Sequence, residues 1–252
     1  MNEAIKRTVL ITGAAGGIGC ALLKKFSIQG FNVVATDQMA HCDVPDNAQY
    51  LQIDLQKLAT DETYRSKALQ ELKGTLSGNR LDVLINNAAV QLLDPISDIT
   101  IDDWDASIAV NLTAPLLLTQ AFLEQLSESN GSIINISSIH ATRTKPGFLS
   151  YSTSKAGLSG LTRAMAVEVG GRIRVNAIEP AAIDTPMLRT GLSAAELNAL
   201  GTLHPTSQIG NPQEIAEVAA LLAGEQRFIN GACISVTGGI DCLLVDPNNS
   251  VI

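Results

Sequence analysis

The chain has 252 residues, 46% hydrophobic and 17% charged, a composition typical of a folded globular protein and not of a disordered one. Its formal net charge of −8 argues against nucleic acid and anionic membranes as partners. No apolar run approaches the roughly 20 residues of a membrane-spanning helix. The opening MNEAIKRTVLITG shows no signal-peptide pattern, and four cysteines without Cys-x-x-Cys pairs predict reduced thiols, a cytoplasmic location and no metal site.

The first predicted elements form a unit that is typical of dinucleotide binding. A strand is expected at residues 8–11, a helix at 20–29 and a second strand at 31–36. The turn between strand and helix places Gly13, Gly17 and Gly19 where the backbone could approach a pyrophosphate, and Asp37 ends the second strand. A plain tight turn would explain the glycines alone, but the flanking strands and the acid favour a cofactor site.

Strands and helices alternate along the rest of the chain. A loop is expected at 38–49 and irregular structure at 184–211. Further strands are expected at 51–53, 81–85, 132–136, 172–178 and 233–236, and helices at 61–76, 101–126, from before residue 151 to about 169, and at 212–223. This alternation predicts an α/β fold in one domain spanning residues 1–252, a Rossmann-type doubly wound parallel sheet of about seven strands with helices on both faces. Residues 246–252 are expected to form an extended tail or an oligomer contact.

Tyr151 and Lys155 stand four residues apart in an expected helix and would project from one face. A free tyrosine has a pKa of about 10 and is a poor acid or base near neutrality. Lowering that pKa to roughly 7 requires about 4 kcal/mol, which one cation at about 4 Å supplies at an effective dielectric near 20. The pair could therefore work as an acid–base unit, although a surface tyrosine and a solvated lysine would show the same spacing.

The candidate polar residues follow the ends of the predicted strands, where ligands bind in such sheets. Here the chain closely resembles the short-chain dehydrogenase/reductase family. The motifs that match in order and spacing, over nearly the whole chain, are Thr12-Gly-x-x-x-Gly17-Ile-Gly19, Asn86-Asn-Ala-Ala89, Asn111, Ser138 and Tyr151-x-x-x-Lys155.

The resemblance implies an oxidoreductase that transfers a hydride between NAD(H) and a secondary alcohol or ketone. Tyr151 would act as general acid and base, and Lys155 would lower its pKa and bind the nicotinamide ribose. Ser138 would hold the substrate oxygen, and Asn111 would position a water in a proton relay. Pro115 has no N–H and removes the helical partner of the Asn111 carbonyl, which could then bind that water. A kink for packing reasons alone is the alternative.

Asp37 bears on the choice of cofactor. A carboxylate at this position accepts hydrogen bonds from the adenosine ribose hydroxyls and repels a 2′-phosphate. Family members that use NADP usually carry Arg or Lys beside it, where this chain has Gln38, so we predict NAD. The remaining cofactor contacts implied by the resemblance are Gly13, Gly17, Ile18, Gly19, Asp54, Leu55, Asn87, Ala88, Ala89, Tyr151, Lys155, Ile183 and Thr185.

Four positions depart from the family pattern. Ala89 and Ala181 replace usual glycines, Glu179 stands in a segment that is commonly neutral, and Gln208 replaces a common arginine. An added Cβ restricts the backbone next to cofactor or substrate. We expect activity to survive, with substrate fit and loop closure most affected.

Residues 185–211 are expected to form a substrate lid, because mobile loops carry specificity on a fixed scaffold. Its apolar residues favour a moderately apolar carbonyl or secondary alcohol, although a helix packed on the sheet would look the same. These residues are Met187, Leu188, Leu192, Leu197 and Leu203. His140, two residues after Ser138, either faces the substrate or is a satisfied loop residue.

Two other functions stay open at this point. A 3-oxoacyl-thioester reductase would prefer NADPH and need a basic docking patch, against which the acidic balance and Asp37 argue. A catalytically silent nucleotide-sensing protein usually lacks the Tyr or the Lys, and both are present. The resemblance further suggests a small-molecule alcohol or ketone as the partner, and a homotetramer, or a homodimer, that contacts through the helices of Asn111 and Tyr151.

Overall fold

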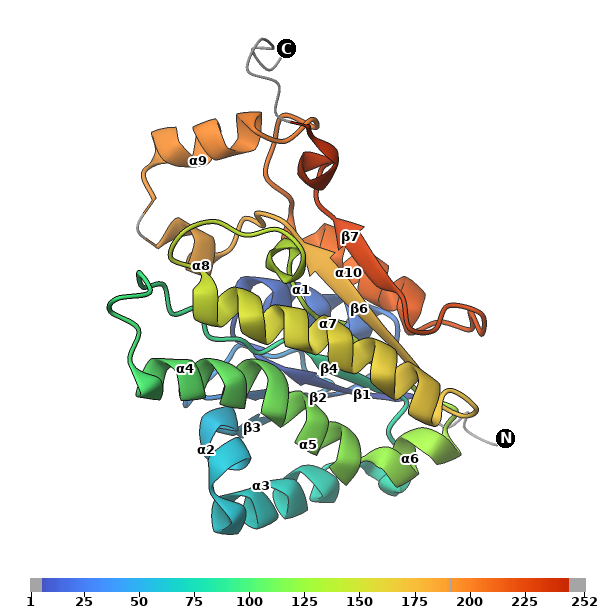
Figure 1. Ribbon diagram of the computed structural model, residues 1–252. Coiled ribbons are helices and arrows are strands. Elements are labelled where there is room, and N and C mark those ends of the chain that lie inside the picture. Colours follow the sequence, from blue (N-terminus) through green and yellow to red (C-terminus); the bar gives the residue numbers. More distant parts are fainter. Residues whose placement is uncertain (1–5, 191, 245–252) are drawn as a thin grey trace.

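The computed structural model describes residues 6–190 and 192–244 (Figure 1). Seven strands form one sheet in the order β3-β2-β1-β4-β5-β6-β7, and every neighbouring pair is parallel. Their bounds are β1 Thr8–Thr12, β2 Asn32–Asp37, β3 Ala48–Gln52, β4 Val83–Asn86, β5 Ser132–Ile136, β6 Arg174–Pro180 and β7 Cys233–Val236. The chain winds outward from β1 in both directions, which confirms the doubly wound α/β fold.

The central strands are buried along their whole length because helices cover both faces of the sheet. Every residue of β1, β4 and β5 is buried. Successive residues of β1 face opposite sides: Leu10 packs in one hydrophobic core and Ile11 in the other. The register pairs Ile11 with Ala35 of β2 and with Ile85 of β4, so the three strand ends lie level at one edge.

Most of the helices contribute residues to one of these two cores. The ten α-helices of the described chain are α1 Gly17–Ile28, α2 Leu55–Thr60, α3 Glu62–Gly74, α4 Ile101–Ile108, α5 Ala114–Ala121, α6 Leu123–Glu128, α7 Leu149–Val169, α8 Pro186–Arg189, α9 Ala194–Thr202 and α10 Pro212–Leu222. Phe26 of α1 and Leu222 of α10 pack on one face, and Leu72 of α3 and Leu118 of α5 on the other. Figure 1 shows α4, α5 and α7 in front of the sheet and α1 behind it.

The helix expected at 101–126 is interrupted. A π-helical turn, Ala109–Thr113, separates α4 from α5, and α6 follows a break at Phe122. Pro115 lies in the first turn of α5 and cannot donate a backbone hydrogen bond, so the widened turn precedes it. The widened turn before Pro115 therefore contains Asn111, whose backbone carbonyl was expected to lose its helical partner.

Other segments are more regular than expected. β3 starts inside the predicted loop, and α2 forms because the Asp54 side chain accepts a 3.0 Å hydrogen bond from the backbone N–H of Lys57. The predicted irregular segment 184–211 contains α8 and α9, which begin at the capping side chains of Thr185 and Ser193. The tail expected at 246–252 lies outside the described residues. Within the described part, no helix has the combination of length and apolarity that crossing a membrane requires.

Candidate active site

A cleft of about 890 Å³ lies along the ends of the strands. The glycine turn, the segments after β2, β4, β5 and β6, and the lid helices all contribute to its walls. The cleft brings together every residue predicted to bind the cofactor, and three of the four predicted catalytic residues. They are Gly13, Gly17, Ile18, Gly19, Asp37, Asp54, Leu55, Asn87, Ala88, Ala89, Ile183, Thr185, Ser138, Tyr151 and Lys155. Asn111 is the exception and lies behind the wall.

Close backbone packing in the glycine turn leaves no space for side chains at Gly13 and Gly19. Gly13 has a φ of +65°, and a Cβ there would lie 2.6 Å from the Cα of Ala88. Gly16, the residue before α1, provides no side-chain cap, and the first turn of α1 has no acidic residue. The N–H groups at this helix end are therefore available to an anion such as a pyrophosphate. The residues present fit a dinucleotide.

Two side chains hold this turn against its neighbours. Asp37 accepts hydrogen bonds from the backbone N–H of Ala15 at 3.0 Å and of Met39 at 3.1 Å. The Asn87 carboxamide donates to the carbonyl oxygens of Thr12 and Gly13, both at 2.9 Å. These hydrogen bonds hold the glycine turn, which lines the cleft, against the ends of β2 and β4.

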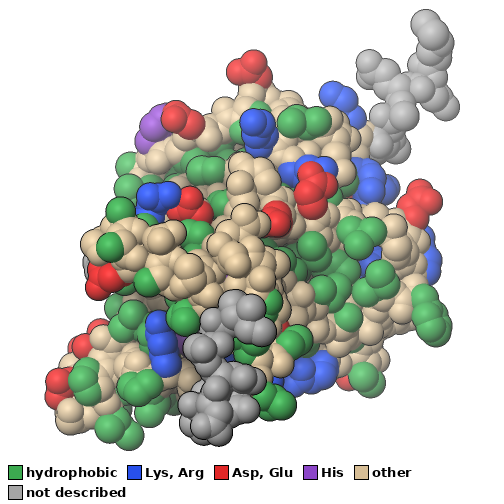
Figure 2. Space-filling model, turned by 90° about the horizontal axis from the view of Figure 1, so that it is seen from above, with side chains coloured by type: hydrophobic (Ala, Val, Ile, Leu, Met, Phe, Trp, Pro, Cys, Tyr) green, Lys and Arg blue, Asp and Glu red, His purple; other side chains and the backbone are tan. Residues whose placement is uncertain are grey.

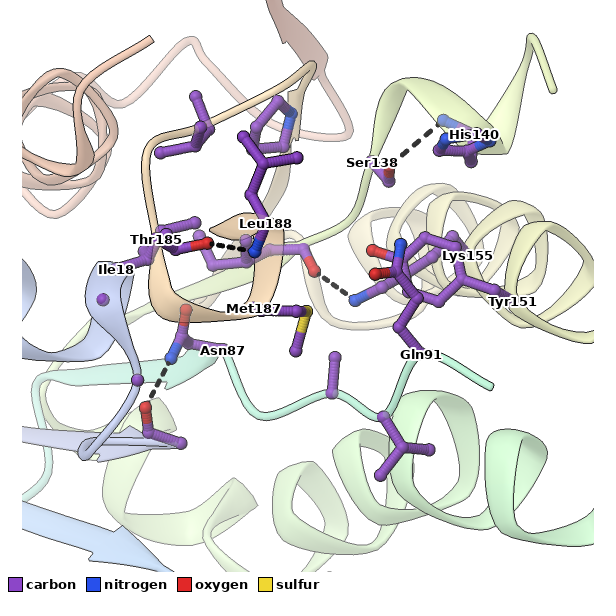
Figure 3. A pocket seen from close by; sticks show the side chains of 18 of the residues that line it. Ile18, Asn87, Gln91, Ser138, His140, Tyr151, Lys155, Thr185, Met187 and Leu188 are labelled. Carbon is purple, nitrogen blue, oxygen red and sulfur yellow. Dashed lines mark hydrogen bonds between the residues drawn. The ribbon is translucent and has the colours of Figure 1, made fainter. Parts of the chain in front are cut away.

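Tyr151 and Lys155 lie together on α7 and both are buried, with 8% and 1% of their surface exposed. The Lys155 Nζ lies 5.7 Å from the centre of the Tyr151 ring and donates a 2.7 Å hydrogen bond to the carbonyl oxygen of Ile136. Figure 3 shows the two side chains adjacent in the cleft, with Gln91 directed towards them. Tyr151 and Lys155 therefore form the expected pair, and both side chains are buried instead of exposed to solvent.

Burial sets the protonation of this pair. It lowers the pKa of Lys155 to about 7 and raises the pKa of Tyr151, which interaction with the Ser138 side chain lowers in part. That Lys155 lowers the Tyr151 pKa stays a prediction. The causes that act on the Tyr151 pKa in this structure are burial, which raises it, and the Ser138 side chain, which lowers it.

Ser138 and His140 form the wall next to Tyr151. Ser138 is buried, with 6% of the residue exposed, and its hydroxyl accepts a 3.1 Å hydrogen bond from the His140 backbone N–H. The His140 ring stacks on Phe148 at 4.2 Å and meets the Tyr151 ring edge-on at 5.8 Å. Burial, together with the charge of Lys145, lowers the pKa of His140 to about 4, so the imidazole is neutral near pH 7. His140 lines the cleft and also contacts Thr144, so both of its predicted roles have support.

Asn111 is fully buried in the π turn and joins three segments. Its carboxamide donates to the Val90 carbonyl and to the Ser154 hydroxyl, both at 2.9 Å, and accepts from the Val90 N–H at 2.8 Å. Ser154 lies on α7, directly before Lys155. Among the described residues, no side chain hydrogen-bonds to the Asn111 backbone carbonyl.

Glu179, one of the unusual residues, is buried at the end of β6. The Ser159 hydroxyl donates to its carboxylate at 2.6 Å and contacts the Ser137 hydroxyl at 2.8 Å. Ser137 in turn donates to the Lys155 backbone carbonyl at 3.0 Å. The carboxylate therefore supports α7 from behind. Of the other departures, Ala89 and Ala181 line the cleft, and Gln208 is exposed outside it.

Several residues of the cleft were not found from the sequence. Four of the five lid residues line it, but Leu197 does not. His204 is buried in the wall, and its Nδ1 lies 2.9 Å from the Leu200 carbonyl oxygen. The lining residues without any sequence signal include Gln91, Arg143, Lys145, Phe148 and Ile240. They follow strand ends or short helices whose path only the tertiary fold determines.

Cys20, Cys42, Cys233 and Cys242 are all free thiols. In residues 6–190 and 192–244, no group of three or more His, Cys, Asp or Glu side chains has the arrangement to hold a metal ion.

Comparison with known proteins shows that the chain is similar to reductases and dehydrogenases. A family model described as enoyl-(acyl carrier protein) reductase matches residues 13–241. The chain is similar to the 3-oxoacyl-[acyl-carrier-protein] reductase FabG of Thermotoga maritima, with 35% identity over 240 residues that cover 93% of this chain and 97% of the relative. Two solved structures each cover 95% of this chain and all of their own: 4-hydroxyisoleucine dehydrogenase complexed with NADH (TM-score 0.84, 31% identity) and ElxO with NADP bound (TM-score 0.84, 27% identity).

Proposed function

Because the chain belongs to the short-chain dehydrogenase/reductase family, we propose that it transfers a hydride between NAD(H) and a secondary alcohol or ketone held in the cleft. The observation that carries this proposal is the buried pair of Tyr151 and Lys155 beside Ser138, at the mouth of the glycine-lined cleft. A bound nicotinamide cofactor supplies or accepts the hydride, and the protein supplies orientation and acid–base chemistry.

Tyr151 is assigned as the group that moves the proton. Its hydroxyl protonates the carbonyl oxygen during reduction, or accepts the alcohol proton during oxidation. The Ser138 hydroxyl, which lies next to it, binds the same substrate oxygen and orients it. Lys155 in its ammonium form stabilises the tyrosinate that forms when Tyr151 has given up its proton, and this attraction is strong because both side chains are buried.

Asn111 is assigned to the supply of that proton. Its carboxamide is occupied by Val90 and Ser154, which leaves the backbone carbonyl as the group that would bind a relay water. The π turn before Pro115 supports this role, because the proline provides no N–H to that carbonyl.

We propose NAD(H) as the cofactor because of the charged side chains at one end of the cleft. The charged side chains that line the cleft after β2 and β3 are Asp37 and Asp54, both carboxylates, and the residue beside Asp37 is the neutral Gln38. A 2′-phosphate would be repelled by these carboxylates, and the neighbouring cation Lys57 already pairs with Asp54 at 3.7 Å. Ribose hydroxyls, in contrast, would donate to Asp37.

A 3-oxoacyl-thioester reductase that uses NADPH is the second candidate, favoured by the similarity to the Thermotoga maritima protein. One experiment separates the two. The change in NADH and NADPH absorbance is followed with a panel of secondary alcohols, their ketones and a 3-oxoacyl thioester. The proposal expects turnover of an alcohol or ketone with NAD(H) at least about tenfold above that with NADP(H), measured as kcat/KM. A preference for NADPH with the thioester would assign the second function instead.

A homotetramer, or a homodimer, is proposed as the assembly. The side chains of Leu112, Leu116 and Leu117 remain only partly buried in the single chain, whereas Leu118 belongs to its core. The three partly buried leucines lie on the helices through which the family resemblance suggests contact. Sedimentation velocity tests this assignment, and a monomer across the concentration range of the assay would contradict it.

A further inference from the structure

The charged side chains of the cleft are separated by sign. Within the described lining, the carboxylates Asp37 and Asp54 lie at the end next to β2 and β3, and the cations Arg143, Lys145 and Lys155 lie at the other end. Lys155 is buried against Tyr151 and has a role in the proposed reaction. Arg143 and Lys145 have none, although both line the place where a substrate must enter.

Neither of these two cations is neutralised by the protein. In the described chain, no carboxylate lies within ion-pair distance of Arg143 or Lys145, and neither side chain makes a hydrogen bond. Asp184, at the base of the lid, already pairs with Arg189 at 2.6 Å. On the face shown in Figure 2, acidic and basic side chains are interspersed. Arg143 and Lys145 lie at the cleft without a carboxylate partner among the described residues.

The loop that carries these cations is held in place beside Tyr151. The Arg143 backbone N–H donates to the Ile139 carbonyl at 2.9 Å. The Lys145 Nζ lies 4.7 Å from the centre of the Phe148 ring, a cation–π contact. Phe148 stacks on His140, and its ring centre is 6.2 Å from that of Tyr151. The charge of Lys145 therefore lies within the length of a small molecule from Tyr151, and Arg143 lines the same cleft.

We infer that the substrate carries an anionic group, a carboxylate or a phosphate, which Arg143 and Lys145 bind while the reacting carbonyl or hydroxyl lies at Tyr151. This inference rests on the proposed function and specifies its substrate. An arginine guanidinium matches the two oxygens of either anion, and a lysine adds a point charge. His140 is neutral near pH 7 and therefore adds nothing to the positive charge of Arg143 and Lys145. The apolar lid residues Met187 and Leu188 would cover the carbon chain between the two ends.

The test compares substrates that differ only in charge. A hydroxy acid is paired with its methyl ester, and a hydroxyalkyl phosphate with the corresponding neutral alcohol. The proteins are wild type, Arg143→Gln, Lys145→Gln, the double variant, and Lys67→Gln as a control with the same change of charge on the exposed face of α3. We expect wild type to favour the anionic member by at least about tenfold in kcat/KM.

The double variant should lose about tenfold on the anionic member, mainly through KM, and less than about twofold on the neutral one. The control should change neither. Raising the salt concentration from about 0.01 M to about 1 M should increase KM for the anionic member alone, since the Debye length falls from roughly 30 to 3 Å. Preference for the hydroxy acid or for the phosphate identifies which anion the site takes.

Turnover that is indifferent to the anionic group, or a double variant that slows both members equally, overturns the inference and leaves the proposed function intact. Absence of turnover with every pair contradicts the proposed function, and a second readout then decides the inference. A dicarboxylate such as malonate is titrated into the complex with NADH, and NADH fluorescence is followed. Binding that weakens about tenfold in the double variant supports the anion site, and equal binding in both proteins overturns it.

Discussion

The ammonium nitrogen of Lys155 lies 5.7 Å from the centre of the Tyr151 ring, and no more than 8% of either residue is exposed. Burial disfavours the charged form of each group. It therefore lowers the pKa of Lys155, to about 7, and raises the pKa of Tyr151. Near pH 7 the phenol is therefore neutral, and Lys155 is divided between its ammonium form and its neutral amine form. The charge balance of the pair changes near neutral pH, where an acid–base catalyst is most useful.

Because Lys155 is buried, its contribution to the free energy of unfolding should depend on pH. The folded pKa is about 7, whereas the ordinary value is 10.5, so the unfolded chain binds more protons between these two values. Stability therefore rises with pH in that window and is lost as pH falls through about 7. From about pH 6 to about pH 9, wild type should gain on the order of 2–3 kcal/mol relative to Lys155→Met in urea unfolding.

The exposed Lys67→Met on α3 provides the matched control and should track wild type at every pH. If the stability difference between wild type and Lys155→Met stays constant over this range, Lys155 does not titrate near neutrality in the folded protein.

The glycine turn predicts a sharp steric effect on cofactor binding. A Cβ at Gly19 would overlap the carbonyl oxygen of Gly13 and lie 2.8 Å from the Cα of Ala14. Gly19→Ala should therefore displace the turn and weaken NADH binding by at least about tenfold in a fluorescence titration. Gly160→Ala, on α7 with no atom within 4 Å of the new Cβ, should bind NADH normally and be as stable as wild type or up to about 1 kcal/mol more stable. Unchanged NADH affinity in Gly19→Ala would show that the turn does not hold the cofactor.

The cofactor preference should depend on Asp37. In the variant Asp37→Ser with Gln38→Arg, a hydroxyl replaces the carboxylate and a cation becomes available to a 2′-phosphate. We expect wild type to prefer NAD by at least about tenfold in kcat/KM, and the variant to move toward NADP by at least about tenfold. The exposed Asp46→Asn removes one negative charge from the neighbouring loop and should leave the ratio unchanged. Wild type that prefers NADP would contradict the assignment.

The strands and most of the site follow from local patterns in the sequence. The apolar runs place β5 at Ser132–Ile136 and β7 at Cys233–Val236, as predicted. Parallel strands present their carboxyl ends at one edge, so motifs far apart in the chain, such as the glycine turn and Tyr151, meet in one cleft.

The features that the sequence does not reveal depend on tertiary surroundings. The π turn at Ala109–Thr113 is a local response of a packed helix to Pro115, and no residue pattern distinguishes it from a simple kink. The direction of the Tyr151 pKa depends on how far solvent is excluded, which spacing alone does not report. Arg143 and Lys145 lie in a loop without periodicity, and the stack of Phe148 on His140 is a tertiary contact that helps to hold that loop at the cleft.

The most direct test of the account replaces the Tyr151 phenol with the phenyl ring of Tyr151→Phe. The variant removes one oxygen from a buried side chain, and it should fold, bind NADH and retain the wild-type far-UV circular dichroism spectrum. With a secondary alcohol that wild type oxidises, we predict that its kcat falls at least about a hundredfold, because the proton acceptor is gone. A variant that folds, binds NADH and turns over within about tenfold of wild type would contradict the role of Tyr151 as the acid–base group.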